Sequence, residues 1–465
     1  MNAVDAWLAS KREAIIEELK AFVRIPSVST DPGHASHVAS AAGFVAAKLR
    51  DAGLADAAVN PTAGHPVVTA AWRHAPGRPT VLVYGHFDVQ PPDPLDAWKT
   101  PPFEPEIRDQ RLYGRGASDD KGPMLIPIKV AEAFLACDGA LPVNMVFLFE
   151  GEEEVSSAHL EAFVAANRDY LAADFVLSAD GAQWRADLPS VITASRGICA
   201  LEINVRGAAK DLHSGRHGGA VANPIQVLAS LLASLHDESG RVAVPGFYDA
   251  VIELPRDELE TIASLPWSET DYLDSIGALA SVGEAGYTML QRNWVRPTLE
   301  FNGVSGGYAG PGKKTVIPSF AQAKITCRLV PDQRPEAIAR AVAGHIRSLA
   351  PAGVKVDVTI ETGGAEPYAV ASDHRGLSLA ESVLEEVAGQ RPIRVRMGAT
   401  VPIGDIFKRV LGLDTIFFSF ATSDEDYHAP NEFFRLASLE LGLKAWRTYL
   451  QQLGTQARDA TRNVE

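Results

Sequence analysis

Histidine and carboxylate residues recur where apolar segments of this sequence end. His86 and Asp88 follow the run TVLVYG, Asp180 ends the run FVLSA, and His428 comes shortly after IFFSF. Imidazole and carboxylate groups without thiolates suit Zn²⁺, Mn²⁺ or Co²⁺, whereas Ca²⁺ and Mg²⁺ favour oxygen ligands alone. Open α/β sheets place their sites at the carboxyl ends of the strands. The pattern therefore predicts a metal site at one edge of a sheet.

The spacing of His86 and Asp88 suits this chemistry. Residues two positions apart on an extended segment project from the same face, so the two side chains should lie together. A carboxylate beside the ring can hold a histidine in the tautomer and orientation that a metal requires.

Two acidic clusters lie in the intervening loops. Asp119 and Asp120 are adjacent in the glycine-rich stretch GRGASDDKG, where two carboxylates repel each other unless a cation lies beside them. The run EGEEE follows another apolar segment and carries four acids, namely Glu150, Glu152, Glu153 and Glu154. Two ions about 3.5 to 4 Å apart could share a bridging aspartate and leave one carboxylate as a base.

Each cluster alone has an ordinary structural interpretation. His86 could be a buried histidine with satisfied hydrogen bonds, and the acids of EGEEE could stabilise the start of the next helix. Asp119 and Asp120 could be turn residues. Together, these interpretations require five ligand-type residues to fall at successive strand ends by coincidence, so a shared metal site explains the pattern better.

Composition limits the class of protein. The 465 residues are 46% hydrophobic and 22% charged, enough for more than one core and unlike a disordered chain. The net charge of −15 is spread along the sequence, so nucleic acid is not an expected partner. No apolar run approaches the roughly 18 to 20 residues of a membrane span, and the N-terminus is amphipathic rather than a signal peptide. With three scattered cysteines, we expect a cytoplasmic protein without membrane contact.

Alternating helices and strands must position these residues. Apolar positions at helical spacing predict one N-terminal helix that ends before Pro26. The following segments predict helices near 38–49, 122–137 and 156–171, and strands near 66–72, 79–89, 143–150 and 173–180. This alternation predicts an α/β layer with a largely parallel sheet.

The pattern changes from about Gly197. GICALEINVRG and AQAKITCRLVP alternate as half-exposed strands, and NPIQVLASLLASL predicts a helix. We expect residues 1–199 and 366–465 to form the catalytic domain and residues 200–365 to form a smaller α+β insert. Within the insert, about 241–300 should be a helical excursion. The last part contains a strand, DTIFFSFA, and a closing helix, ASLELGLKAWRTYLQQL.

Seven motifs, in order over nearly the whole chain, carry a family resemblance: GHFDVQP, GRGASDDKGP, EGEEE, KDLHSG, KTVIP, CRLVP and DYHAPNE. The sequence resembles the two-metal peptidases that include carnosinases, bacterial dipeptidases, aminoacylases and succinyl-diaminopimelate desuccinylase. The dipeptidase and carnosinase branch is most similar, since its second-metal acid is Asp, as Asp180 is here. The resemblance implies helices on both faces of the parallel sheet and a ferredoxin-like insert that acts as a lid and dimerisation domain.

The resemblance also implies two divalent metal ions per chain, with Zn²⁺ favoured over Mn²⁺ or Co²⁺. The ligand sets would be His86, Asp119 and Asp180 for one ion, and Asp119, Glu154 and His428 for the other. Asp88 would orient His86, and Glu153 would be the general base. The peptide bond between Asp119 and Asp120 would be cis. Glu152 stands where relatives often have a neutral residue, so its charge should raise neighbouring pKa values.

Five residues in the later motifs would bind the substrate: His213, Thr315, Arg328, Gly398 and Thr400. His213 would reach the active site of the partner subunit in a homodimer. Thr315 and Arg328 would contact the carboxylate end of the substrate, and Gly398 and Thr400 lie in the glycine-rich loop MGATVPIG. Thr400 replaces the Ser that is common in relatives. Without the resemblance, His213 would be interpreted as a turn histidine and Arg328 as a surface charge.

The predicted reaction is hydrolysis of the amide bond of dipeptides or similar short peptides with a free carboxylate. A metal-held water would attack the carbonyl, while Glu153 moves a proton to the leaving amine. His213 and the metals would stabilise the oxyanion, and Arg328 would hold the carboxylate. One alternative is an N-acyl or N-carbamoyl amino acid amidohydrolase. The other is a non-catalytic, metal-stabilised binding protein, which the intact Glu153 and ligand positions disfavour.

Overall fold

The chain folds into two compact units. The computed structural model describes residues 2–456. Unit 1 contains the chain up to Thr193, Val370–Val395 and the part from Ile406 on, and unit 2 contains Ala194–Ala369 and Arg396–Asp405. The sequence predicts that Arg396–Asp405 is part of the catalytic domain. This segment instead belongs to unit 2, where Arg196 and Arg328 bind it through hydrogen bonds.

The main sheet of unit 1 has the strand order β1-β2-β6-β3-β7-β17-β8. Its strands are β1 Ala58–Asn60, β2 Val67–Trp72, β3 Thr80–His86, β6 Asn144–Glu150, β7 Phe175–Ser178, β8 Ser190–Ser195 and β17 Thr415–Phe417. Strands β6, β3, β7 and β17 are parallel to one another, and β1, β2 and β8 run antiparallel to their neighbours. The four central strands are buried along their full length, as parallel strands covered on both faces must be. The prediction of a largely parallel sheet is therefore confirmed.

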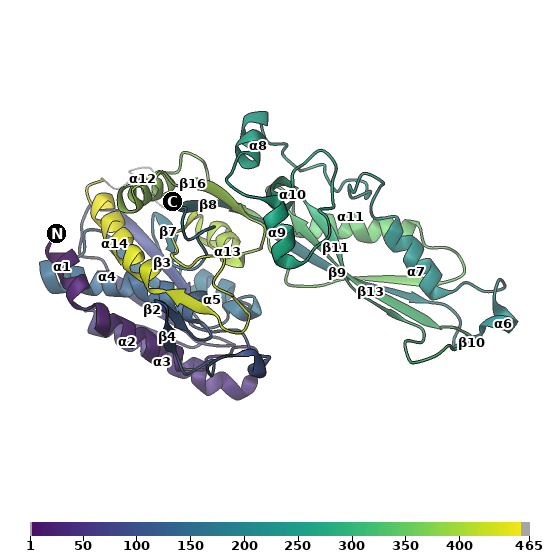
Figure 1. Ribbon diagram of the computed structural model, residues 1–465, viewed down its shortest axis with the longest axis horizontal. Coiled ribbons are helices and arrows are strands. Elements are labelled where there is room, and N and C mark those ends of the chain that lie inside the picture. The colour runs from purple at the N-terminus through teal and green to yellow at the C-terminus, as the bar shows by residue number, and fades with distance from the viewer. Residues whose placement is uncertain (1, 457–465) are drawn as a thin grey trace. The chain divides into compact units, whose positions relative to one another are not determined.

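Helices cover both faces of this sheet (Figure 1). Neighbouring residues of β3 show this. Tyr84 packs against Phe407 of α13 with ring centroids 5.5 Å apart, whereas Met124 of α4 fills the space beside Gly85. The helices that contribute to unit 1 are α1 Ala3–Ser10, α2 Arg12–Val23, α3 Ala35–Asp51, α4 Gly122–Asp138, α5 Leu160–Ala166, α12 Arg375–Ala388, α13 Pro402–Leu411 and α14 Leu436–Leu453.

The N-terminal segment forms two helices, so the prediction of one helix is wrong. Helices α1 and α2 are separated at Lys11, whose φ of −97° and ψ of 0° are not helical. Leu8 and Ile15 are buried on either side of the break and lie two helical turns apart in sequence. Because the apolar spacing continues across the break, the sequence pattern does not reveal it.

Short elements lie near the edge of the sheet that carries the acidic loops. The strands β4 Glu106–Arg108, β5 Arg111–Tyr113 and β18 Phe433–Arg435 form a small sheet in the order β18-β5-β4. A single helical turn, η4 Glu153–Val155, follows β6. Another, η3 Ala117–Lys121, precedes α4. Two similar turns are η1 Pro32–His34 and η2 Leu95–Ala97.

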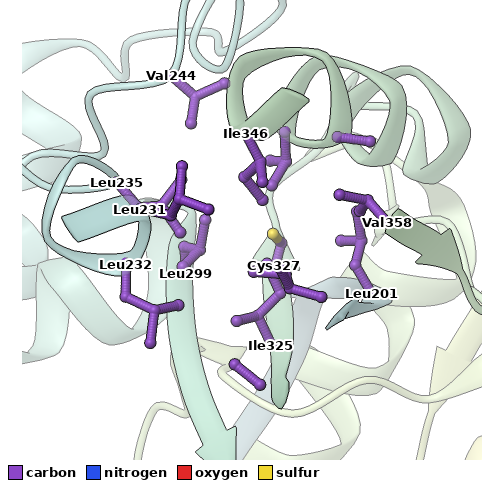
Figure 2. Close-up of a cluster of buried hydrophobic side chains, with 14 of the residues drawn as sticks. Leu201, Leu231, Leu232, Leu235, Val244, Leu299, Ile325, Cys327, Ile346 and Val358 are labelled. Carbon is purple, nitrogen blue, oxygen red and sulfur yellow. The ribbon is translucent and has the colours of Figure 1, made fainter. Parts of the chain in front are cut away.

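Unit 2 is built on an antiparallel sheet with the order β11-β13-β9-β14. Its strands are β9 Gly197–Arg206, β11 Thr298–Gly306, β13 Phe320–Leu329 and β14 Lys355–Ile360. Alternate residues of β9 and β13 are buried against α7 Pro224–Ala233 and α11 Pro335–Ser348. Figure 2 shows the resulting core, which contains Leu201, Leu231, Leu299, Cys327 and Ile346. The predicted α+β insert is therefore present.

The stretch 241–300 contains three short helices, α8 Arg256–Ala263, α9 Glu269–Ile276 and α10 Met289–Val295. Its last residues begin β11, which the sequence analysis did not predict because most of this strand is exposed and its residues do not alternate. The remaining elements are β10 Leu212–His213, α6 Ser214–His217, β12 Val316–Ile317, β15 Tyr368–Ala369 and β16 Ile393–Met397. Within residues 2–456, no helix has the length and apolar character needed to cross a membrane.

Candidate metal centre

Five side chains from separate parts of unit 1 meet at the carboxyl edge of its sheet. His86 ends β3, Glu154 follows β6, Asp180 follows β7, and Asp119 lies in the turn η3. Their ligand atoms form two groups, each with all atoms within 4.8 Å of one another: His86, Asp119 and Asp180 in one, and Asp119, Glu154 and His428 in the other. Asp119 belongs to both groups.

Each carboxylate oxygen of Asp119 faces a different imidazole. Oδ1 lies 3.0 Å from Nε2 of His86, and Oδ2 lies 3.0 Å from Nε2 of His428. The same His428 nitrogen is 3.3 Å from Oε2 of Glu154. Although burial acts in the opposite direction, hydrogen bonds with His428 and His86 lower the pKa of Asp119 below its ordinary value. An ionised carboxylate in this position can serve two cations at once.

Asp88 is fully buried beside His86 and holds two parts of the site in place. Its backbone oxygen is 3.1 Å and its Oδ1 3.4 Å from Nδ1 of His86. The two carboxylate oxygens also accept the backbone N–H groups of Glu153 at 3.2 Å and Glu154 at 3.1 Å. Asp88 therefore fixes the His86 ring together with the segment that carries Glu154.

Glu153 lies beside the ligands but belongs to neither group. Burial raises the pKa of its carboxyl well above the ordinary value, and the charges of Asp180 and Glu154 raise it further. A carboxyl group with a raised pKa is a candidate for accepting and releasing a proton during a reaction.

The donor set fits divalent cations. It combines two imidazoles with three carboxylates and contains no thiolate. Burial, with a contribution from the charge of Asp119, raises the pKa of Asp180 to about 6. Buried acids that crowd one another in this way are stabilised in their ionised form by a bound cation.

A glutamate that the sequence analysis overlooked holds the loop that carries Asp119. Oε1 of Glu432 accepts the N–H groups of Ser118 at 3.0 Å and Asp119 at 3.1 Å. Its Oε2 accepts the N–H of Gly116 at 2.9 Å and a guanidinium N–H of Arg115 at 2.7 Å. Glu432 is the last residue of the motif DYHAPNE. Its place in this motif was the one sign in the sequence that it could have a role at the site.

Asp120 also supports the site. The peptide bond between Asp119 and Asp120 is cis, as the resemblance implied. Oδ2 of Asp120 accepts the N–H of His86 at 3.2 Å, and its buried Oδ1 has no hydrogen-bond partner in the described chain. Burial and then the charge of Asp180 raise the pKa of Asp120 well above its ordinary value.

Glu152 turns away from the ligands. Its Oε1 accepts the N–H of His65 at 2.8 Å, and its Oε2 is 2.9 Å from Nδ1 of His159. The neighbouring charges that act most strongly on Glu153 belong instead to His86 and Asp180. The charge of Glu152 is therefore not among the largest influences on the pKa of Glu153.

Three of the predicted substrate-binding residues lie together in unit 2. Arg328 donates a hydrogen bond from Nη1 to Oγ1 of Thr400 at 2.8 Å, and Arg196 donates from Nε to the carbonyl of Gly398 at 2.7 Å. A Cβ atom at Gly398 would lie 2.1 Å from Oδ1 of Asn293, so a larger residue here would displace the Asn293 side chain. The sequence analysis did not identify Arg196 as a partner of this loop.

His213 and Thr315 lie at the other end of the sheet of unit 2. Nε2 of the exposed His213 is 3.5 Å from Oγ1 of Thr315. His213 pairs with Val316, which precedes β13, whereas Arg328 is near the end of that strand. The eight steps along the strand from Phe320 to Arg328 span roughly 26 Å at about 3.3 Å per residue. Within one chain, His213 and Arg328 are therefore too far apart in unit 2 to contact the same small molecule.

Two ligand groups that share an aspartate at the carboxyl edge of a parallel sheet are an arrangement suited to a metal-dependent hydrolase. The chain belongs to Peptidase family M20/M25/M40, whose model matches residues 82–452. It is a metallopeptidase, and the family membership together with the ligand groups establishes divalent metal binding.

Relatives cover most of the chain. It is 31% identical over 460 residues to the Cys-Gly metallodipeptidase dug1 of Schizosaccharomyces pombe, with 96% of each chain aligned. It is 33% identical over 372 residues to the Beta-Ala-His dipeptidase of Homo sapiens, covering 79% of this chain and 73% of that protein. Its fold matches the M20 family metallo-carboxypeptidase Sso-CP2 from Sulfolobus solfataricus with a TM-score of 0.84 and 28% identity, covering 95% and 99% of the two chains.

Proposed function

We propose that this chain is a dipeptidase that hydrolyses the peptide bond of short substrates with a free carboxylate. The position of Glu153 carries the proposal, because this half-buried acid interacts electrostatically with residues of both ligand groups and belongs to neither. The similarity to dipeptidases over most of the chain supports the same substrate class.

The metal ligands in this proposal are His86, Asp119 and Asp180 for one ion, and Asp119, Glu154 and His428 for the other. Bound divalent ions would lower the pKa of a water molecule and polarise the substrate carbonyl. Zn²⁺ is the first candidate, since mixed nitrogen and oxygen ligands suit it, with Mn²⁺ and Co²⁺ next. Activity and metal content after reconstitution with each ion would identify the physiological metal.

Glu153 acts as the general base in this proposal. It takes the proton of the attacking water and delivers it to the leaving amine, a role that suits a carboxyl whose pKa is raised by burial. Asp88 holds the ring of His86 and the backbone of Glu153 in fixed positions during these steps.

The free carboxylate of the substrate would bind to Arg328, assisted by the loop that contains Gly398 and Thr400. The hydrogen bond from Arg328 to Thr400 supports this arrangement, because it joins the guanidinium to the loop. A guanidinium is suited to a carboxylate, with which it forms charge-assisted hydrogen bonds.

Replacement of Glu153 by Gln tests the proposal. Turnover of a dipeptide should fall by about 10²- to 10⁴-fold, the usual contribution of a general base, while metal content stays near that of the wild type. Glu152→Gln is a matched control, since Glu152 pairs with His159 and should be dispensable for turnover. Near-normal turnover of the Glu153→Gln variant would reject the mechanism.

A substrate panel tests the substrate class. Dipeptides with a free carboxylate should be hydrolysed much faster than N-acyl and N-carbamoyl amino acids by the metal-loaded protein. The reverse order of rates would identify an amidohydrolase.

We also propose that unit 2 forms a homodimer in which His213 and Thr315 complete the active site of the partner chain. The separation of His213 from Arg328 within unit 2 supports this, since a dipeptide spans only about 7 Å. Strand β11 is at an edge of its sheet, and 63% of the surface of its residue Val304 is exposed. This edge strand provides a surface for a second copy of the chain.

Hybrid dimers test the shared site. Mixing the His213→Ala and Glu153→Gln variants should restore activity, because one site of the hybrid then combines an intact Glu153 with His213 of the other chain. Absence of any restored activity, although mass measurements show hybrid dimers, would show that His213 does not act across the dimer. The cytoplasmic location remains a prediction from composition.

A further inference from the structure

A cavity of unit 2 that contains Arg328 has an excess of positive charge. The cavity has a volume of about 550 Å³. The charged side chains that line it are Arg196, Arg292, Arg296, Arg328, Glu284 and Glu300. Arg296 is neutralised by Glu284, with which it forms hydrogen bonds of 2.7 and 2.8 Å. The excess stands out because the whole chain has a net charge of −15.

Arg196 and Arg328 line the same cavity. Arg328 pairs with Ile198 across strands β13 and β9, and Arg196 precedes Ile198 by two residues, just before β9 begins. Because side chains alternate between the two faces of a sheet, Arg328 lies opposite the core face, on which Cys327 lies (Figure 2). The two arginines are therefore diagonal neighbours, a separation that long side chains can bridge.

Neither arginine has a carboxylate partner within 4 Å in the part of the chain that the structure describes. Arg196 donates to the carbonyl of Gly398, and its Nη1 is 3.5 Å from the carbonyl of Arg296. Only 6% of Arg196 is exposed, and burial and then the charge of Arg328 lower the pKa of Arg196 to about 10. Glu300 attracts Arg196 but is exposed. A buried arginine beside a half-buried one, neither paired with a carboxylate, favours binding of an anion.

We propose that Arg196 is a specificity-determining residue that binds a second carboxylate of the substrate, next to the free carboxylate held by Arg328. The preferred substrates are then dipeptides with Asp or Glu as the C-terminal residue. The two carboxylates of such a residue are only a few carbon atoms apart, which suits diagonal neighbours on a sheet. The inference rests on the proposed dipeptidase function and adds the substrate class.

The pair Ala-Glu and Ala-Gln tests this inference, because the two dipeptides have nearly the same shape and differ in one charge. The wild type should hydrolyse Ala-Glu with a kcat/KM at least about tenfold higher, the ratio expected from one charge-assisted hydrogen bond. Arg196→Gln should bring this ratio close to one, and Arg196→Lys should retain a preference for Ala-Glu. Arg334→Gln, which removes an exposed arginine outside the cavity, should keep the wild-type ratio.

The two Arg196 variants separate charge from loop positioning, because both lack the Nε–H group that donates to Gly398 and only the Lys variant keeps the charge. Equal loss of the preference in the Lys and Gln variants would show that Arg196 only positions the loop and would overturn the inference. Equal kcat/KM values of the wild type for Ala-Glu and Ala-Gln would also overturn it, while leaving the dipeptidase function intact.

A binding measurement separates this inference from the proposed function. Calorimetry of the metal-loaded protein should show tighter binding of L-glutamate than of L-glutamine, with the difference lost in Arg196→Gln. If that difference is present but neither dipeptide is hydrolysed, the two-carboxylate site is supported and the dipeptidase function is rejected. Equal affinity for the two amino acids would argue against the site.

Discussion

Replacing Asp88 by Asn exchanges one carboxylate oxygen for an amide NH₂ group and leaves the size of the side chain almost unchanged. In the wild type, the two oxygens accept the N–H groups of Glu153 and Glu154 at 3.2 and 3.1 Å, and Oδ1 lies 3.4 Å from Nδ1 of His86. An asparagine has only one acceptor oxygen, so one of the two N–H groups would face another donor. The substitution thus disturbs the support of two predicted ligands, His86 and Glu154.

The structure suggests how large the effect should be. A lost hydrogen bond to a buried charged group costs about 1.5 to 3 kcal/mol. Loss of a carboxylate that orients a ligating histidine lowers metal affinity by about 10- to 100-fold, which corresponds to about 1.4 to 2.7 kcal/mol. We therefore expect the Kd for Zn²⁺ to rise by about 10- to 100-fold in Asp88→Asn, measured by competition with a chelating dye.

Asp174→Asn is a matched control. Asp174 is also buried and accepts the N–H of Thr80 at 2.7 Å, at the opposite end of β3 from His86. This variant should lose thermal stability without a change in metal affinity. The reasoning about Asp88 would be refuted by a wild-type Kd in Asp88→Asn, or by equal loss of affinity in both variants.

Three further predictions concern the loop, the metal and pH. Gly398→Ala should raise KM by at least about tenfold, because its Cβ would lie 2.1 Å from Oδ1 of Asn293, whereas Gly344→Ala has nothing within 4 Å and should leave KM unchanged. Removal of metal with a chelator should increase hydrogen exchange in β3 and in the loop before α4 and leave the core strands of unit 2 unchanged, which mass spectrometry can measure. Burial raises the pKa of Glu150 to about 8 from 4.5, so the folded protein holds a proton that the unfolded chain releases between these pH values. The free energy of unfolding of metal-free protein, measured with urea, should therefore fall as pH rises through this range, and less steeply in Glu150→Gln.

The meeting of the predicted ligand residues could be anticipated because these residues follow strand ends. His86 and Asp180 end or follow apolar runs that form the neighbouring parallel strands β3 and β7. Their meeting at one edge follows from parallel pairing, and parallel pairing follows from the alternation of helices and strands. The sequence therefore contained both the residue types and their approximate location.

The supporting residues could not be anticipated in the same way. Glu432 holds the backbone of Ser118 and Asp119, more than 300 residues earlier in the chain. Its role depends on which loops meet in the fold, and the residues around it in sequence do not specify that. Arg196 was overlooked for a similar reason, since its contact with Gly398 joins segments about 200 residues apart.

The charges of the ligands favour the proposed occupancy by two ions over occupancy by one. Three predicted ligand carboxylates lie in one cluster, whereas the two histidine ligands are neutral when they bind a metal. The charge of Asp88 is compensated by two N–H groups and the ring of His86, and the raised pKa values of Asp120 and Glu153 favour their neutral forms. A single divalent ion would leave one of the three negative charges uncompensated. A second ion would compensate it, and the two oxygens of Asp119, each facing a different imidazole, could serve one ion each.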